Sequence, residues 1–146
     1  MTCLDTTFLI DLQREMEAGR PGRAAQWIRD NGEEEAGISA VAWGEFLEGL
    51  RERSHPILTE LTGRFSVWPV GEETAEIYGT VVRGLRQQGR LVGSNDLWIA
   101  CTALNRGAAL VTRNVEEMAR VPGLRVITLC MYWVGVVHLN PYPVQK

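Results

Sequence analysis

The stretch GSNDLWIACTALNRGAALVTRN, residues 93–114, consists of an apolar helical pattern followed at once by a short apolar strand pattern. Ser94 is a typical N-cap residue and Gly107 is typical of a helix end, so a buried helix is predicted between them. The segment AALVT, residues 108–112, is predicted to be a strand. A helix that leads directly into a strand is the repeating unit of α/β proteins.

The same alternation of strand and helix patterns continues outward in both directions. Strands are predicted up to Asp5 and at residues 36–39, 64–70 and 123–129. Helices are predicted from Asp5 to about Glu17 and at 20–30, 40–53, 71–89 and 114–121, with Pro21 in the first turn of the second one. The predicted fold class is therefore α/β, with a central parallel sheet sandwiched between helices.

The length of 146 residues is that of one domain with a substantial core. The net charge of −3 shows that the whole chain is not a polycation that coats nucleic acid. Its basic residues are nonetheless fourteen Arg and one Lys, and the planar guanidinium of Arg suits phosphate groups. A bias in genome composition is the other explanation of that excess.

Three widely spaced cysteines and two histidines exclude a zinc site of ordinary spacing. The cysteines are interpreted as buried apolar residues in a reducing compartment, and no signal peptide is expected before Asp5. The longest apolar run, about residues 126–137, is too short to span a bilayer. The sequence thus predicts a cytoplasmic protein without a membrane partner.

Polar residues recur where the predicted strands end. Asp5 ends the first strand, Glu45 lies in the helix after the second, and Asp96 lies in the first turn of the helix from Ser94. Asn114 follows the strand that ends at Thr112. Because ligands of parallel α/β sheets bind at the carboxyl ends of the strands, these residues are expected to meet at one edge.

Three carboxylates that converge without a cation repel one another, so at least one should be protonated. A divalent cation relieves this repulsion, and a ligand set of oxygen atoms alone favours Mg²⁺ or Mn²⁺. Such an ion lowers the pKa of a bound water and stabilises charge on a phosphate.

Each residue also has a purely structural interpretation. Asp5 is a good N-cap, Asp96 is favoured by the helix dipole, and Asn114 is a common turn residue. Glu45 shares its flank of the helix with Glu48 and Glu52, which is typical of a solvated acidic stripe. The combined placement, rather than any single residue, favours a functional site.

This set of residues resembles the PIN-domain family and, within it, the VapC-like toxins of toxin–antitoxin pairs. The resemblance covers about residues 2–127 and depends on LDTTFLIDL, ISAVAWGEFLEGL, GSNDLWIACTALNRGAALVTRN and RVPGLRV. It implies a three-layer α/β/α sandwich with a central parallel sheet, and a metal-dependent endoribonuclease that uses Mg²⁺ or Mn²⁺. The domain would span residues 1–127, and residues 128–146 would be an apolar extension of unassigned role in the same domain.

Carried over by position, Asp5, Glu45 and Asp96 would be the catalytic acids and metal ligands, with Asn114 in the fourth catalytic place. A metal-activated water would attack the scissile phosphodiester. Asn114 is a departure, since this position is often Asp in the family and a neutral residue weakens a second metal site.

The resemblance also assigns supporting residues. Thr6 and Thr112 would orient the ligands from a second layer. Glu116 and Glu117 are close enough to reach the site, but they are expected on a solvated helix face. Arg113 and Trp98 are candidates for RNA contacts, with Trp98 expected in the core.

The partners implied by the resemblance are an RNA substrate, a cognate antitoxin whose segment covers the acidic groove, and a second copy in a homodimer. The alternative function is that of a catalytically inactive PIN-fold module that binds protein or RNA. Metal-dependent cleavage of RNA distinguishes the two.

Overall fold

The computed structural model describes residues 1–129 of the chain. Five strands and seven helices alternate within these residues: β1 (Thr2–Leu4), α1 (Thr6–Ala18), α2 (Arg23–Asp30), β2 (Ala36–Ser39), α3 (Ala40–Gly49), α4 (Pro56–Arg64), β3 (Ser66–Trp68), α5 (Glu72–Gln87), α6 (Ser94–Asn105), β4 (Ala109–Thr112), α7 (Val115–Met118) and β5 (Val126–Thr128).

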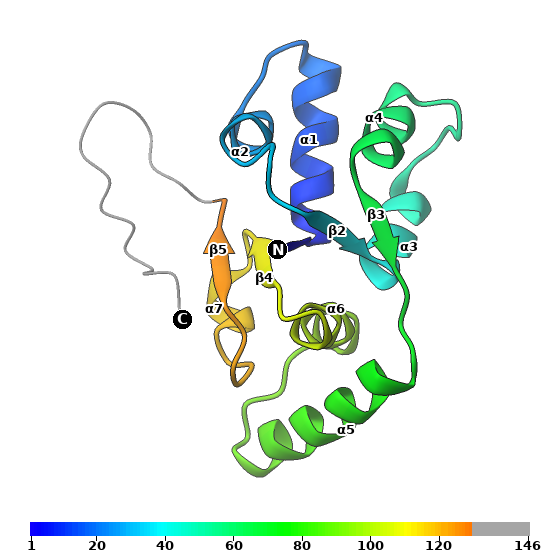
Figure 1. The fold of residues 1–146 in the computed structure, drawn as a ribbon. Helices are drawn as coiled ribbons and strands as arrows, with labels where there is room; N and C mark the ends of the chain where they lie inside the picture. Colours follow the sequence, from blue (N-terminus) through cyan, green and yellow to red (C-terminus); the bar gives the residue numbers. More distant parts are fainter. Residues whose placement is uncertain (130–146) are drawn as a thin grey trace, which may run out of the picture.

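The strands form one parallel sheet in the order β3-β2-β1-β4-β5. Helices α1 and α2 lie on one side of the sheet, and α6 with α5 outside it lies on the other (Figure 1). This arrangement confirms the predicted three-layer α/β/α sandwich. Strand order reverses at β1, so the carboxyl ends of β1 and β4 border the crevice in which such sheets bind ligands.

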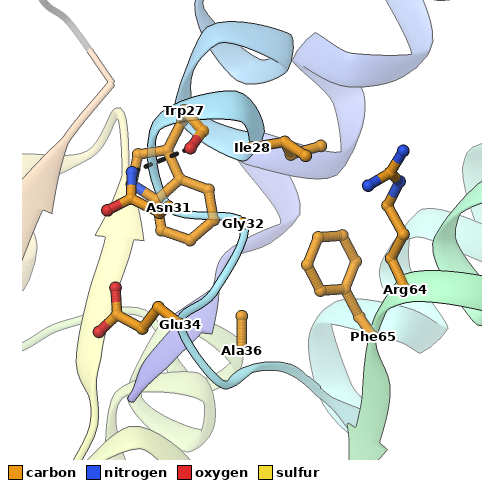
Figure 2. A pocket seen from close by; sticks show the side chains of 8 residues that line it. All are labelled: Trp27, Ile28, Asn31, Gly32, Glu34, Ala36, Arg64 and Phe65. Atoms are coloured by element: carbon orange, nitrogen blue, oxygen red, sulfur yellow. Dashed lines mark hydrogen bonds between the residues drawn. The ribbon is translucent and has the colours of Figure 1, made fainter.

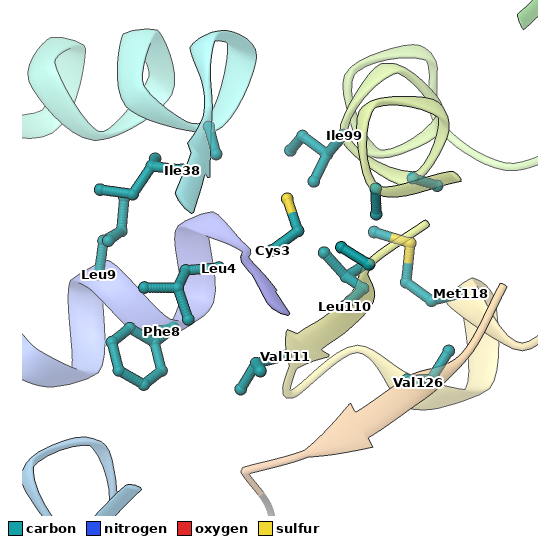
Figure 3. Packing of buried hydrophobic residues seen from close by; sticks show 14 of the residues in the cluster. Cys3, Leu4, Phe8, Leu9, Ile38, Ile99, Leu110, Val111, Met118 and Val126 are labelled. Atoms are coloured by element: carbon teal, nitrogen blue, oxygen red, sulfur yellow. The ribbon is translucent and has the colours of Figure 1, made fainter. Parts of the chain in front are cut away.

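Alternating side chains of the central strands supply both halves of the core. Leu4 of β1 lies with Phe8 and Leu9 of α1, whereas Cys3 points toward Ile99 of α6 (Figure 3). All five side chains are fully buried. This period-2 alternation over two apolar faces is what a sheet covered on both sides requires.

One predicted helix start and one predicted N-cap are wrong. Pro21 lies before the second helix, whose first residue is Arg23, because the Glu15 carboxylate accepts hydrogen bonds from the backbone N–H groups of Ala24 and Ala25. Gly93, rather than Ser94, occupies the N-cap position of α6, and its N–H is engaged by a side chain from α7. The helix end at Gly107 is confirmed by a left-handed backbone there, with φ of 63°.

Helix α4 is absent from the prediction, and the helix predicted over 40–53 ends at Gly49. The N-cap of α4 is His55, whose Nδ1 accepts a hydrogen bond from the N–H of Ile57. Histidine is not among the usual N-cap residues, which is why the start was missed. Pro56 at the first position and the buried pair Ile57 and Leu61 were the available signals.

No helix within residues 1–129 combines the length and the apolarity needed to cross a bilayer. Strand β5 ends at Thr128, and Leu129 still donates its backbone N–H to the carbonyl of Thr112. The predicted role of residues 128–146 as an apolar extension falls, from residue 130 onward, outside the described residues.

Candidate active site

Asp5 lies where β1 passes into α1, and it is buried with 2% exposure. One carboxylate oxygen, Oδ1, accepts a hydrogen bond of 2.7 Å from the N–H of Thr6 and so caps α1. The other, Oδ2, accepts from the hydroxyl of Thr112 at 2.6 Å and from that of Thr7 at 3.4 Å. Both interpretations of Asp5 are therefore compatible, since one oxygen caps the helix while the other faces the end of β4.

Burial raises the pKa of Asp5 above its usual value, although the hydrogen bonds from Thr112 and Thr6 act in the opposite direction. The charge of Glu45 raises this pKa further. A carboxylate that is desolvated and close to a second negative charge is stabilised by a nearby cation.

Asp96 lies in the first turn of α6. Burial raises its pKa to about 6, and the charges of Asp5, Glu117 and Glu45 contribute in that order. Four carboxylates from α1, α3, α6 and α7 thus act on one another at the same edge of the sheet. The charges of Asp5 and Glu45 thus reach Asp96, which is consistent with the predicted meeting of these three residues.

Glu45 of α3 is held by two donors. Its Oε1 accepts from the hydroxyl of Thr6 at 2.9 Å, and its Oε2 accepts from the side-chain amide of Asn95 at 3.4 Å. Thr6 and Thr112 therefore contact Glu45 and Asp5, as expected of orienting residues. Asn95 and Thr7 have the same kind of contact, and sequence reasoning missed both.

Asn114 directly precedes α7, and its side-chain N–H donates to Oε2 of Glu117 at 2.9 Å. The other Glu117 oxygen accepts from the N–H of Gly93 at 2.9 Å, and a Cβ at Gly93 would lie 3.8 Å from both Glu117 and Asp96. Glu117 is only half-buried, so it lies on a partly solvated face as predicted and also reaches the site, whereas Glu116 is exposed. The spacing of Asn114 and Glu117, one helical turn apart, was the available signal.

The donor set suits a hard divalent cation, because carboxylate oxygens are its preferred ligands. Within residues 1–129, however, no three His, Cys, Asp or Glu side chains already form a cluster that could hold one ion. Glu45 and Glu117 are instead turned toward their hydrogen-bond donors.

A groove of about 270 Å³ between α1 and α3 begins at Glu45 and continues past Arg14. A second hollow lies at the amino ends of β2 and β3, on the opposite edge of the sheet (Figure 2). Trp27 and Phe65 line it, together with Glu34, whose carboxylate pairs with the N-terminal amine. Of the four site carboxylates, Glu45 lines the first groove, which makes that groove the candidate path for a ligand.

Trp98 is not among the residues that line the groove between α1 and α3. It is half-buried and stacks on Tyr78 of α5, with 3.7 Å between ring centroids and 9° between planes. The expectation that Trp98 lies in the core is wrong, because its side chain is only half-buried and lies outside the buried hydrophobic cluster.

Comparisons with known proteins agree on one family. The family model described as PIN domain matches residues 2–124. "Ribonuclease VapC1" of Haemophilus influenzae strain R2866 is 32% identical over 127 residues, covering 84% of this chain and 92% of that protein. "Ribonuclease VapC4" of Mycobacterium tuberculosis is 32% identical over 102 residues, covering 65% and 78% respectively.

Solved structures show the same relationship. VapBC-1 from nontypeable Haemophilus influenzae matches with a TM-score of 0.73 and 28% identity, covering 89% of this chain and 98% of that one. DNA-bound VapBC from Salmonella typhimurium matches with a TM-score of 0.74 and 27% identity, covering 89% and 100%.

Proposed function

The chain belongs to the PIN domain family, and we propose that it is an endoribonuclease, the toxin of a toxin–antitoxin pair. The single observation that carries this proposal is the network of hydrogen bonds that holds Asp5, Glu45 and Glu117 around Asp96 at the carboxyl edge of the sheet. The relatives that are named ribonucleases share most of their length with this chain, which supports the same reaction here.

We propose that cleavage depends on Mg²⁺ or Mn²⁺, held by Asp5 and Asp96 and by Glu45. Such an ion, when bound, supplies a water of lowered pKa and a positive charge beside the scissile phosphate. The pKa of Asp96, raised by burial and then by the neighbouring carboxylates, supports this assignment, because a bound cation would stabilise the charged form against both effects.

The protein's own residues fix the geometry of the site. Thr112 and the N–H of Thr6 hold the two oxygens of Asp5, and the hydroxyl of Thr6 positions Glu45. Asn114, the neutral residue in the fourth catalytic place, holds Glu117. The family often has Asp at the position of Asn114, and in this chain Glu117, one helical turn later, supplies that negative charge.

The partners are an RNA substrate, a cognate antitoxin and a second copy of the chain. The structural relatives are described as VapBC complexes, which supports the antitoxin. An antitoxin segment with a basic side chain would fit the acidic edge and the groove beside Glu45. Elution of the antitoxin-free protein as a stable monomer in gel filtration would contradict the homodimer.

The direct test of the function is incubation of purified, antitoxin-free protein with total cellular RNA in Mg²⁺, Mn²⁺ or EDTA. Discrete fragments that appear with metal and disappear with EDTA are expected. Intact RNA in all three conditions, from protein that is shown to be folded, would favour the inactive RNA- or protein-binding module.

Replacement of Glu117 by Gln is expected to reduce cleavage about 10- to 100-fold, the usual cost of removing a group that supports a metal ligand. Glu117→Gln removes the charge that acts on Asp96 and retains an oxygen for the N–H of Gly93. Initial rates at saturating Mn²⁺ measure the effect. Glu116→Gln, at the exposed neighbouring position, is the matched control, and equal rates for both variants would exclude Glu117 from the site.

Asp96→Asn is expected to stabilise the metal-free protein at pH 7.5 by about 1–2 kcal/mol after solvent screening. The folded pKa of about 6 lies above the usual value of 3.8, so the folded state binds protons more tightly. Stability linked to Asp96 is thus full below pH 3.8 and is lost as the pH rises toward 6. Urea unfolding in EDTA at pH 4 and pH 7.5 measures this, and a stabilisation that is equal at both pH values would contradict it.

A further inference from the structure

Arg113, the first residue after β4, is joined to α1 by two contacts. Its backbone N–H donates to the hydroxyl of Thr7 at 3.1 Å, and its Nε lies 3.0 Å from Oδ2 of Asp11. Thr7 and Asp11 are one turn apart on the same face of α1, about 6 Å along its axis. Thr7 in turn contacts Asp5, so the Arg113 side chain is held about one helical turn beyond the acidic site.

A second arginine lies on the same part of the surface. Arg14 follows Asp11 by three residues on α1, is exposed, and lines the groove that begins at Glu45. Burial raises the pKa of Asp11, and Arg113, Arg14 and Arg23 oppose that rise, so all three cations lie near this carboxylate. Three basic side chains and the acidic Glu15 therefore act on the half-buried Asp11, with Arg113 and Arg14 as the strongest of these charges.

The proposed substrate makes such a surface necessary. An RNA strand carries a negative charge at every nucleotide, and the site offers it four carboxylates. A cation at the site would offset charge only around the scissile phosphate. The flanking phosphates need basic side chains, because contacts to phosphate supply the main sequence-independent part of RNA affinity.

We propose that Arg113 and Arg14 form a phosphate-binding strip that holds the RNA strand on the α1 side of the scissile bond, with Asp11 as the residue that positions Arg113. This inference rests on the proposed ribonuclease function and adds to it the path of the substrate. The Arg113 side chain is 39% exposed although it is paired with Asp11, so a phosphate can approach it from solvent. Arginine suits this role because its planar fork donates several hydrogen bonds to phosphate oxygens.

The arrangement favours RNA over an acidic protein segment as the occupant. Arg113 pairs with Asp11, and Arg14, three residues later on α1, lines the groove that also contains Glu45. Through Thr7, which donates to Asp5 and accepts from the N–H of Arg113, this surface is joined to the residues that would act on a phosphodiester. A strand cut at Asp5 and Asp96 must continue past that edge.

The test is binding of a fluorescein-labelled single-stranded RNA 12-mer in EDTA, measured by anisotropy from 50 to 300 mM salt. The slope of the logarithm of the binding constant against the logarithm of the salt concentration falls by about 0.7 for each phosphate contact that is lost. At 0.1 M salt this corresponds to an increase in Kd of about fivefold. Arg113→Ala and Arg14→Ala are each expected to raise Kd about fivefold, and the double variant about 25-fold. Arg113→Lys is expected to recover part of the loss, and Arg83→Ala, at an exposed position on α5, is the matched control.

Cleavage separates this role from a catalytic one. Because the strip binds the substrate and the transition state alike, the variants are expected to raise KM and to leave kcat nearly unchanged. Binding that equals wild type in both alanine variants, or equal losses in Arg83→Ala, would overturn the strip while the ribonuclease stands. Unchanged RNA binding with weaker retention of the co-expressed antitoxin would assign the surface to that protein instead. Wild-type protein that neither binds nor cuts RNA would overturn the strip and the proposed function together.

Discussion

Asp5→Asn and Asp96→Asn are each expected to reduce metal-dependent RNA cleavage by about 100-fold or more. Even the removal of a group behind a metal ligand costs about 10- to 100-fold, and these two carboxylates are the proposed ligands themselves. Asn can still accept the hydrogen bond from the N–H of Thr6, so α1 keeps its cap in Asp5→Asn. The measurement is the initial rate of cleavage of a defined RNA at saturating Mn²⁺.

The matched control is Asp30→Asn, an exposed carboxylate at the end of α2. It changes the net charge by the same amount and is expected to leave the rate unchanged. Circular dichroism confirms folding of each variant. A folded Asp5→Asn protein that retains more than about a tenth of the wild-type rate would exclude Asp5 from the catalytic site.

Gly37→Ala is expected to destabilise the protein by about 3 kcal/mol, which is about 10 °C in Tm for a chain of this size. Gly37 lies in the middle of β2, and a Cβ there would be only 2.0 Å from Cε2 of Trp68. The indole is 3% exposed and has Arg106 over its ring at 5.0 Å, so it has no empty space to enter. Thermal and urea unfolding measure the loss.

Gly79→Ala is the matched control for this substitution. Gly79 lies in α5, where an added Cβ would meet no atom within 4 Å, and Ala is favoured over Gly in a helix by about 0.5–1 kcal/mol. The two substitutions should therefore change stability in opposite directions. A Gly37→Ala protein as stable as wild type would show that Trp68 does not occupy the space over Gly37.

The fold could be predicted because its central elements have strong local patterns. The strand at 36–39 and the helix from 94 to its end at Gly107 were found nearly to the residue, since apolar runs and glycine punctuate them clearly. Helix α4 was missed, since its N-cap is His55. The start of α2 depends on Glu15, eight residues earlier, which no local propensity reveals.

The site was predicted in part for a related reason. The carboxyl ends of parallel strands meet by topology alone, so Asp5, Asp96 and Asn114 could be grouped from their places in the sequence. For Glu117 the spacing from Asn114 was only a weak signal, because its membership depends on which way a side chain of a one-turn helix points and on the backbone N–H of Gly93. The periodic spacing of apolar residues predicts local helices and strands, but it does not reveal contacts between segments that are distant in sequence.

The central claim is that the acidic edge holds a divalent cation, and calorimetric titration of metal-free protein with MnCl₂ at pH 6 tests it most directly. Because Asp96 is partly protonated at this pH, binding should release a fraction of a proton, which is seen as a dependence of the enthalpy on the buffer. Saturable binding with proton release in wild type, lost in Asp96→Asn, is the predicted result. No saturable binding, or equal binding by the variant, would contradict the account.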